Sequence, residues 1–385
     1  MAILSKFSIP IATLPHVWHL LFSIVATQSS GNPWCHLGQK AVFFRRSAWG
    51  ISEAIKNLLK SRKKSKGIVY LPDYFCNQAL IPSRLLPVKL VFYPITKDLT
   101  PEWSLLNDLV SQYGNPDVFI LVHYFGFPND IKKATQFCQQ VGSKLLEDGA
   151  HVLVPYGEIG RHSWATVYSP YKLLPVPQMG IFVTSEKVEF NSKASDKKKL
   201  IDFDTCAWMG KRLIQSFLVN CKISWRNGKV AQFELDIETE FNKNLTISTF
   251  PLQLLKILES KLGEYKIIRR EYYKIIEEQI LLIKNDVANP VFLSLPDDVC
   301  PYLFPMRMHS SIIENVYYSL NRIGIPAQTW PDLPPEIKGN PYNKIAKKLR
   351  GSILTIPIHQ SLTKNHIEYI AHNLHGVILE ALRNK

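Results

Sequence analysis

Short apolar runs recur through the first half of the chain and alternate with more polar segments. They are rich in β-branched and aromatic residues and too short for typical helices, which is typical of buried strands; they lie at 67–71, 88–93, 117–122, 164–168 and 180–184. A segment of helical periodicity follows the third run. Because helices that connect successive strands cover both faces of a parallel sheet, this alternation predicts an α/β fold with a mostly parallel central sheet flanked by helices.

The second half of the chain has a different pattern. Residues 185–249 are polar and irregular, and residues 252–283 form one long, charged segment of helical periodicity. From residue 289 onward, a strand at 290–293 is followed by helical patterns that end at 367–382, which indicates an α+β domain. We therefore expect an apolar N-terminal arm, a large α/β domain, and a linking helix with a small C-terminal α+β domain, with bounds 1–38, 39–250 and 251–385.

The N-terminal arm is nearly uncharged from residue 7 to residue 38. Pro10 and Pro15 interrupt it, and it contains no uninterrupted apolar stretch of the length that a membrane span needs. We expect the arm to pack on its own domain or on a partner subunit, without stable membrane insertion. A signal peptide or a membrane-associated segment remains the alternative.

Charge and cysteine content narrow the class of protein. The net charge of +14 comes from 46 Lys and Arg against 32 Asp and Glu, and much of the excess is local, at 60–66, 197–199 and 344–350. These runs lack a recognisable nucleic-acid-binding module, so we expect solvated surfaces that attract anionic substrates, and no nucleic-acid partner. The six cysteines include no Cys-x-x-Cys pair, which favours a cytoplasmic protein without a metal site.

An acid, an imidazole and an amine follow two of the expected strands. Asp148 and His151 come after the apolar Leu145-Leu146, and Lys172 comes shortly after the run at 164–168. Pyridoxal phosphate (PLP) enzymes hold their cofactor on a lysine, with an acid at the pyridine nitrogen. Asp148 would favour the protonated ring, and His151 would stack on the ring or hydrogen-bond its phenolate oxygen. Apolar neighbours are expected to lower the pKa of Lys172.

The sequence around these residues resembles the DegT/StrS family of PLP-dependent aminotransferases, which includes the sugar aminotransferases. The corresponding segments here are Glu147-Asp148-Gly149-Ala150-His151, Ser169-Pro170-Tyr171-Lys172 and Met179-Gly180. Further similar segments lie at 71–76, 122–128 and 356–363, so that the resemblance spans roughly residues 40–380. It implies a divergent family member with the fold-type I architecture of PLP transferases.

A phosphate cradle is expected at Ser47 and Ala48, where a helix begins. Apolar residues at helical spacing follow, so the backbone N–H groups of this turn would bind phosphate. The resemblance implies help from Ser169, and Arg46 is a further candidate. The family has a threonine where this chain has Ala48, so the cradle lacks one hydroxyl. The simpler alternative is that Ser47 only caps the helix.

Three further positions are candidates for binding the cofactor or the substrate. Either Tyr74 or Phe75 is expected to cover the cofactor ring, and the register does not decide between them. Arg307 would pair with a substrate carboxylate or close a salt bridge, with equal weight. Asn242 is a weak candidate for completing the neighbouring subunit's site, because the family's motif there is not reproduced. His123, His309 and His359 are expected to be structural.

The resemblance implies an aminotransferase that acts as a homodimer. An amino acid, by resemblance glutamate or glutamine, would donate the amino group, and a keto compound, by resemblance a nucleotide-linked sugar, would accept it. Lys172 would carry the protons. Two alternatives remain: a PLP-dependent lyase or dehydratase, which shares the cofactor site, and a non-catalytic family member that acts as a binding protein.

Overall fold

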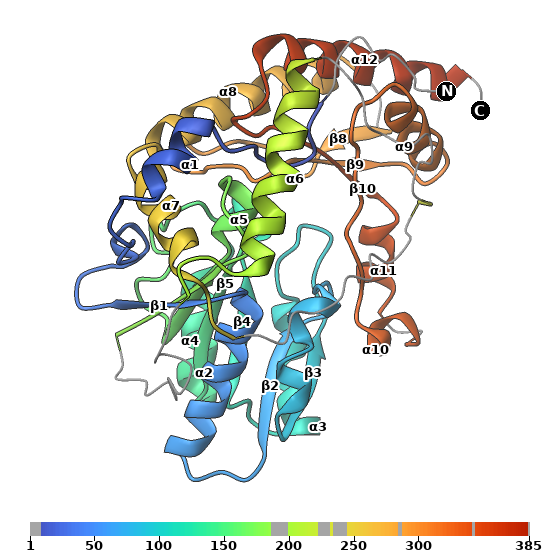
Figure 1. The fold of residues 1–385 in the computed structure, drawn as a ribbon. Helices are drawn as coiled ribbons and strands as arrows, with labels where there is room; N and C mark the ends of the chain where they lie inside the picture. The colour runs from blue at the N-terminus through green and yellow to red at the C-terminus, as the bar shows by residue number, and fades with distance from the viewer. Residues whose placement is uncertain are drawn as a thin grey trace.

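The computed structural model describes residues 9–185, 199–221, 232–233, 245–283, 287–340 and 343–383. Two sheets organise this part of the chain, one of seven strands and one of three. Figure 1 shows the large sheet in the lower half of the molecule and the small sheet in the upper half, beneath α12.

The large sheet has the strand order β1-β7-β6-β5-β4-β2-β3. Its central pairs, from β3 through β2, β4 and β5 to β6, are parallel, whereas β7 runs antiparallel to both β6 and β1. The strands are β1 Lys40–Phe44, β2 Gly67–Pro72, β3 Val88–Tyr93, β4 Val118–Val122, β5 Lys144–Gly149, β6 Ala165–Tyr168 and β7 Gly180–Thr184. The expectation of a mostly parallel central sheet is confirmed.

Helices and short 3-10 turns flank this sheet. The helix α2 spans Ser47–Ser61 and buries Ile51, Ile55, Leu58 and Leu59, the stripe that its sequence predicted. The helix α4, Ile131–Val141, begins where the Asp130 side chain accepts from the Lys133 N–H and ends at Gly142. The remaining elements here are α3 Leu106–Tyr113 and the 3-10 helices Asn32–Trp34, Asn77–Leu80, Ser83–Leu85, Trp103–Leu105 and Tyr124–Gly126.

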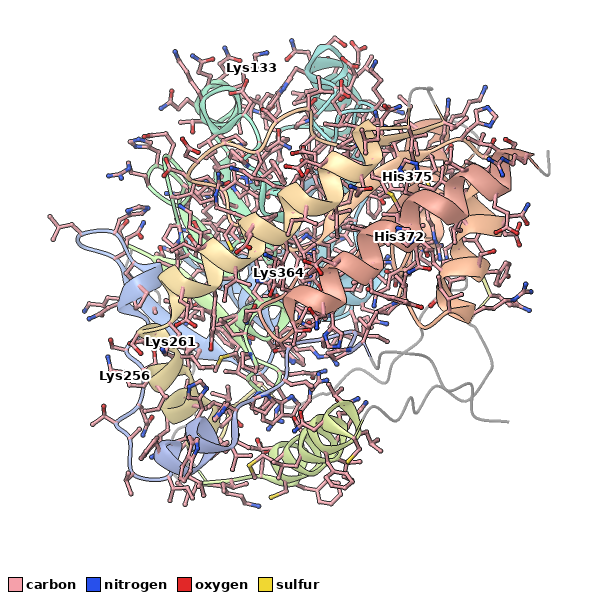
Figure 2. All side chains as sticks on the ribbon, turned by 90° about the horizontal axis from the view of Figure 1, so that it is seen from above. Lys133, Lys256, Lys261, Lys364, His372 and His375 are labelled. Carbon is pink, nitrogen blue, oxygen red and sulfur yellow. The ribbon has the colours of Figure 1, made fainter. Side chains whose placement is uncertain are left out.

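The C-terminal part builds the small antiparallel sheet, in the order β10-β9-β8, against several helices. Figure 2 shows α8 and α12 lying side by side along the top of the molecule, where the His375 ring reaches the Gln279 carbonyl. The elements are α7 Thr249–Glu259, α8 Leu262–Leu281, β8 Ala288–Pro290, β9 Phe304–Met308, α9 Ile313–Arg322, α10 Pro335–Lys338, α11 Lys344–Arg350, β10 Ile353–Ile356 and α12 Lys364–Arg383.

Three local expectations differ from the structure. The single helix expected at 252–283 is two helices, α7 and α8, because the chain turns at Ser260, whose hydroxyl bonds to the Ile257 carbonyl and competes with the helix. The strand expected at 290–293 is β8, at 288–290. The irregular region contains the helix α6, Phe203–Asn220, which begins where Asp202 accepts from the Thr205 N–H.

The described part of the N-terminal arm packs on its own chain. The His359 ring lies 3.0 Å from the Pro10 carbonyl, and the Leu14 N–H donates to the Ser361 hydroxyl at 2.8 Å. Further along, the Gln253 amide donates to the Ala26 carbonyl, close to α1, Val17–Ser23. Among the described helices, none combines the length and the apolar character that a membrane crossing requires.

Candidate active site

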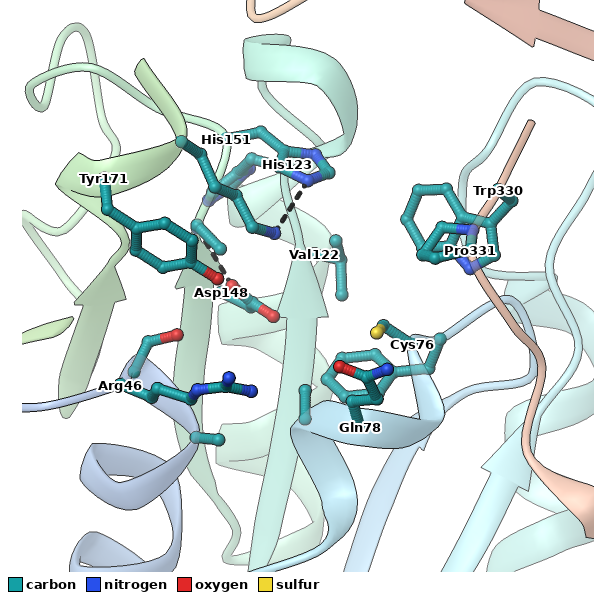
Figure 3. A pocket seen from close by; sticks show the side chains of 16 residues that line it. Arg46, Cys76, Gln78, Val122, His123, Asp148, His151, Tyr171, Trp330 and Pro331 are labelled. Atoms are coloured by element: carbon teal, nitrogen blue, oxygen red, sulfur yellow. Dashed lines mark hydrogen bonds between the residues drawn. The ribbon is translucent and has the colours of Figure 1, made fainter. Parts of the chain in front are cut away.

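One cavity at the carboxyl ends of the parallel strands collects most of the expected site residues. Its lining includes Asp148 from the end of β5, and Lys172 from α5, the one-turn helix Pro170–Leu173 that directly follows β6 (Figure 3). His151, Ser47, Ala48 and Phe75 also line it, whereas Tyr74, Ser169 and Arg307 do not. The position agrees with the usual placing of ligands in open α/β sheets.

Asp148 is buried at the end of β5, and its orientation is fixed. Its Oδ1 accepts the N–H of Ala150 at 2.9 Å. Burial raises the pKa of Asp148, and the nearby positive charge of Lys172 opposes that rise. The second carboxylate oxygen therefore remains available to a cationic group in the cavity.

The protonated nitrogen of His151 is selected by the backbone. Phe125 adopts a left-handed conformation with φ of 56°, and its N–H points at Nδ1 of His151 at 3.2 Å. A backbone N–H can only donate, so Nδ1 accepts and Nε2 carries the proton. Burial lowers the pKa of His151 well below its ordinary value, so the ring is neutral. His151 therefore presents an Nε2–H donor to the cavity.

Lys172 lies directly beside that donor, with its Nζ 3.1 Å from Nε2 of His151. Burial lowers the pKa of Lys172, but Tyr171, Tyr302, Cys76 and Asp148 together raise it, and the net direction is upward. The expected lowering is thus outweighed, because apolar neighbours are not the whole environment of this amine. The Nε2–H of His151 acts in the opposite sense, since it hydrogen-bonds only to an unprotonated amine.

The expected phosphate cradle assembles at the N-terminus of α2. The hydroxyls of Ser47 and Ser169 lie 2.7 Å apart although they are distant in sequence. Arg46, not Ser47, occupies the N-cap position, and no side chain caps the first turn. Gly180 makes this arrangement possible: a Cβ there would lie 2.1 Å from the Ser47 nitrogen. The start of β7 and the start of α2 therefore approach one another as closely as a glycine permits.

Of the two aromatic candidates, Phe75 lines the cavity and Tyr74 does not. Tyr74 is fully buried and packs on Trp330, with ring centroids 4.4 Å apart. Trp330 and Pro331 in turn form the wall opposite His151 and Tyr171, as Figure 3 shows. Sequence reasoning missed this wall, because a tryptophan in a loop far along the chain carries no pattern that links it to the site. Cys76, Gln78 and Tyr171 also line the cavity and were missed, although they adjoin residues that were chosen.

The remaining candidates lie elsewhere or have other partners. One guanidinium nitrogen of Arg307 donates to the Lys97 carbonyl at 2.5 Å and lies 3.9 Å from Asp98, so the geometry favours the salt-bridge alternative. Asn242 lies outside the described residues. His123 lines the cavity, but its Nε2 pairs with the buried Glu147 at 2.8 Å while Nδ1 accepts the Asn129 N–H. This is the structural role expected for it.

The residues of the cavity fit PLP chemically. A buried carboxylate suits a pyridinium nitrogen, and a neutral imidazole N–H suits a phenolate oxygen. A primary amine suits the cofactor aldehyde, and the Ser47 hydroxyl at a helix N-terminus, which accepts from the adjacent Ser169 hydroxyl, suits a phosphate. The donor set therefore matches each end of this cofactor.

Known structures share the fold. No protein-family model matches the sequence, and no curated protein matches it. Among solved structures, the chain is similar to the putative sugar aminotransferase Spr1654 from Streptococcus pneumoniae in its PLP form, with a TM-score of 0.71 and 14% identity over 97% of this chain and 100% of that chain. It is also similar to Helicobacter pylori PseC, an aminotransferase of pseudoaminic acid biosynthesis, with a TM-score of 0.67 and 15% identity over 96% and 94%.

A third similar structure is the DegT DnrJ EryC1 StrS aminotransferase from Brucella abortus, with a TM-score of 0.61 and 15% identity over 89% of this chain and 85% of that chain. At such identities the likeness establishes the architecture alone. The protein has the fold of the PLP-dependent sugar aminotransferases.

Proposed function

We propose that the protein is a PLP-dependent aminotransferase that moves an amino group from an amino acid to a keto acceptor, and that the acceptor is a nucleotide-linked keto-sugar. The observation that carries the proposal is the convergence of Asp148, His151 and Lys172 on one cavity next to the paired hydroxyls of Ser47 and Ser169. The titles of the similar structures, which include a PLP form of a sugar aminotransferase, support the choice of cofactor and substrate class.

Each residue then has a defined task. When bound, PLP supplies an electron sink for the carbon that loses a proton. Asp148 would hold the ring nitrogen in its charged form, and the Nε2–H of His151, which faces Lys172 in this structure, would donate to the phenolate oxygen once PLP is bound. The hydroxyls of Ser47 and Ser169, with the Ala48 N–H, hold the phosphate. Lys172 takes a proton from the donor's α carbon and later delivers one to the acceptor's carbonyl carbon.

The absorption spectrum of the purified protein tests the proposal. We expect a visible band after addition of PLP that changes when glutamate or glutamine is added. Lys172→Ala should remove both the band and turnover, whereas Lys133→Ala, on the exposed surface of α4 (labelled in Figure 2), should keep them. A protein that gives no cofactor band even in excess PLP would be the non-catalytic alternative.

A lyase or dehydratase would give the same band, because proton removal is shared. Incubation with keto-sugars and amino donors separates the two reactions. An aminated sugar together with the keto acid of the donor supports transamination. Loss of water or of another group from the sugar, without consumption of the donor, would identify elimination instead.

We also propose a homodimer, and a cytoplasmic location that follows from the proposed substrates. The exposed helix α6 supports the dimer: within Phe203–Asn220, Thr205 is its only buried residue, while Phe203, Ile214 and Phe217 are more than half exposed. The helix α1 likewise exposes Trp18 and Phe22. Exposed apolar side chains at helical spacing are typical of a face that another protein covers.

The position of α6 favours a second copy of this chain as the partner. A second hollow, between α6 and the start of α2, is lined by Trp208 and Lys211 on one side and by Arg46 on the other. Arg46 also lines the cofactor cavity. A protein that covered α6 would therefore border the active site. Light scattering of the purified protein measures its oligomeric state, and a monomer would contradict this proposal.

A further inference from the structure

Arg269, in the middle of α8, is a buried cation without a negative partner in the described chain. Its side chain is fully buried. Its Nε donates to the Gln360 side-chain oxygen at 2.9 Å, and its two terminal nitrogens donate to the carbonyls of Tyr302 at 2.8 Å and Leu173 at 2.9 Å. All of these acceptors are neutral. Burial accordingly lowers the pKa of the Arg269 guanidinium.

Burying an unpaired guanidinium costs desolvation free energy that an apolar side chain does not. Apolar side chains of similar volume are frequently as stable or more stable than a buried charge. Packing alone therefore does not explain an arginine here. Its fork of donors does what no apolar side chain can do, since it fixes several carbonyl groups from separate segments relative to one another.

Two of those carbonyls connect Arg269 to Lys172 by separate routes. The first is that of Leu173, the residue after Lys172 and the last residue of α5. Because α5 has a single turn, it cannot hold its own geometry, and its last carbonyls need partners from outside. Arg269 supplies one such partner, and the Gln360 amide supplies another at 2.8 Å to the same oxygen.

The second route runs through Tyr302 and His151. Arg269 binds the Tyr302 carbonyl, and the Tyr302 N–H donates to the Phe125 carbonyl at 2.8 Å. The Phe125 N–H in turn fixes His151, whose Nε2 faces the Lys172 amine. The Tyr302 ring also stacks on His151, with centroids 4.7 Å apart. A closed ring of contacts thus begins and ends at Arg269 and contains Lys172.

We propose that Arg269 is a positioning residue that holds the Lys172 backbone and the His151 donor at a fixed separation, so that the His151–Lys172 hydrogen bond forms. The inference rests on the proposed function only in taking Lys172 as the reacting amine. In this way α8, which lies outside the large sheet, helps to fix the position of Lys172.

The test measures the reactivity of Lys172 itself, in the full chain stripped of cofactor. The rate of acylation of Lys172, followed by mass spectrometry from pH 6 to 10, reports how the amine is held. Titratable groups around it are Tyr171, Tyr302, Cys76, Asp148 and His151, and those around Arg269 are Cys300, Tyr302 and His359, so the whole profile is compared between variants. The wild type is compared with Arg269→Lys and Arg269→Gln.

Arg270→Gln is the matched control. Arg270 is the next residue of α8, and it also donates to carbonyls, at Pro296 and Val299, but it lies near the surface and pairs with Asp297. The unfolding temperature of every variant is recorded, so that a general loss of structure is separated from a local change at Lys172.

Loss of one hydrogen bond should change the Lys172 acylation rate by about 2–10-fold. We expect this change in Arg269→Gln, a smaller one in Arg269→Lys, and none in Arg270→Gln. In the loaded enzyme, kcat should fall while KM for the amino donor stays near the wild-type value. A folded Arg269→Gln with the wild-type acylation profile would overturn the inference.

If Arg269→Gln does not fold, the acylation profile of Gln360→Leu tests the inference instead. This variant keeps the arginine, but it removes one donor from the Leu173 carbonyl and the acceptor from Nε of Arg269. The same shift in acylation supports the inference, and a wild-type profile refutes it. A wild-type protein without a cofactor band would refute the proposed function, while the acylation result would still answer the question about Arg269.

Discussion

The edge of the sheet that carries Asp148 and Lys172 differs from the helix α6 beside it in how each is held. At the edge, the His151 side chain is hydrogen-bonded to Phe125 and Lys172, and the Leu173 carbonyl accepts from Gln360, so the groups there are held by segments far apart in the chain. The helix α6 has an Asp202 cap at its start and an ion pair from Asp202 to Arg45, but Thr205 is its only fully buried residue.

The contrast indicates two different sources of order. The sheet edge is fixed within one chain, as a site that must place reacting groups requires. The helix α6 is left with apolar residues facing outward, as a surface that gains its packing from a partner would be. Substitutions at the sheet edge should therefore change turnover and not the oligomeric state, and substitutions on the exposed face of α6 should change the oligomeric state.

The largest expected effect is at the sheet edge. Asp148→Asn removes the charge that stabilises the protonated ring nitrogen, so turnover should fall by about 10²–10⁴-fold, the range typical of a missing acid–base contribution. The oligomeric state should not change. Steady-state kinetics and light scattering on the same sample measure both, and Asp130→Asn, at the surface cap of α4, is the control. Full activity of Asp148→Asn would contradict the proposed role of Asp148 at the ring nitrogen.

A charge on α6 should weaken the dimer, the property that Asp148→Asn leaves unchanged. Ile214→Asp or Phe217→Asp places a carboxylate on the exposed face, and the dissociation constant of the dimer should rise by about 30–100-fold because an apolar contact is lost and a charge is desolvated. Sedimentation over a dilution series measures it. Asn220→Asp, at the exposed end of the helix, should leave dissociation unchanged. A dimer unaffected by either substitution would place the interface elsewhere.

A matched pair of glycines sharpens the contrast. Gly180→Ala forces a Cβ against the Ser47 backbone, so the protein should lose about 1–3 kcal/mol of stability and bind PLP more weakly. Gly210→Ala, in α6, meets nothing within 4 Å and should gain up to about 1 kcal/mol from helix propensity. Urea unfolding and cofactor titration give both values. Equal effects at the two sites would mean that the close approach at Gly180 relaxes without penalty.

The smallest effect concerns Asp73, which follows β2 at the same edge. Burial raises the pKa of Asp73 to about 6, although the Asn343 side chain and the Ile95 N–H donate to it. Because an unfolded aspartate titrates near 4, this group destabilises the fold progressively as pH rises from about 4 to about 6. Asp73→Asn removes that penalty, so its stability relative to wild type should improve by about 1–2 kcal/mol between pH 4 and pH 7.

Asp117 provides the opposite sign. Burial acts to raise the pKa of Asp117, but hydrogen bonds from Lys64, Ile68 and Arg62 outweigh it and lower the pKa. Its stabilisation is present above the unfolded pKa and lost as pH falls, so Asp117→Asn should be more harmful at pH 7 than at pH 4. Urea unfolding at both pH values measures the two variants. The same pH trend in both would contradict these assignments.

Much of the candidate site could be predicted from sequence because its residues lie close together in the chain. Asp148, His151 and Lys172 lie within 25 consecutive residues, and strands that pair in parallel must bring their carboxyl ends together. The same locality explains Ser47 and Ala48, which begin a helix with a clear apolar stripe. Strands β2 to β7 followed from their short, mostly apolar runs for the same reason, whereas the edge strand β1 was not predicted.

The rest depends on contacts that no local pattern encodes. Trp330 reaches the cavity from the C-terminal part of the chain, and Arg269 reaches the Leu173 carbonyl, next to Lys172, from α8, in both cases through tertiary packing. The helix α6 was missed because its apolar residues are exposed and spread through a polar context. Tyr74 and Phe75 differ by a single residue of register, and only tertiary packing places Phe75 in the cavity lining and Tyr74 against Trp330.

The left-handed backbone at Phe125 has a consequence for tolerated substitutions. The direction of the imidazole proton depends on the main-chain amide at that position, whereas the buried phenyl ring packs near His151 and Trp330 and contributes to stability. Glycine or asparagine, which adopt this conformation readily, should preserve the tautomer, whereas proline, which has no amide hydrogen, would release it. Loss of the buried ring at 125 should therefore lower the stability of the protein, while the proton of His151 keeps its direction toward Lys172 as long as the main-chain amide stays in place.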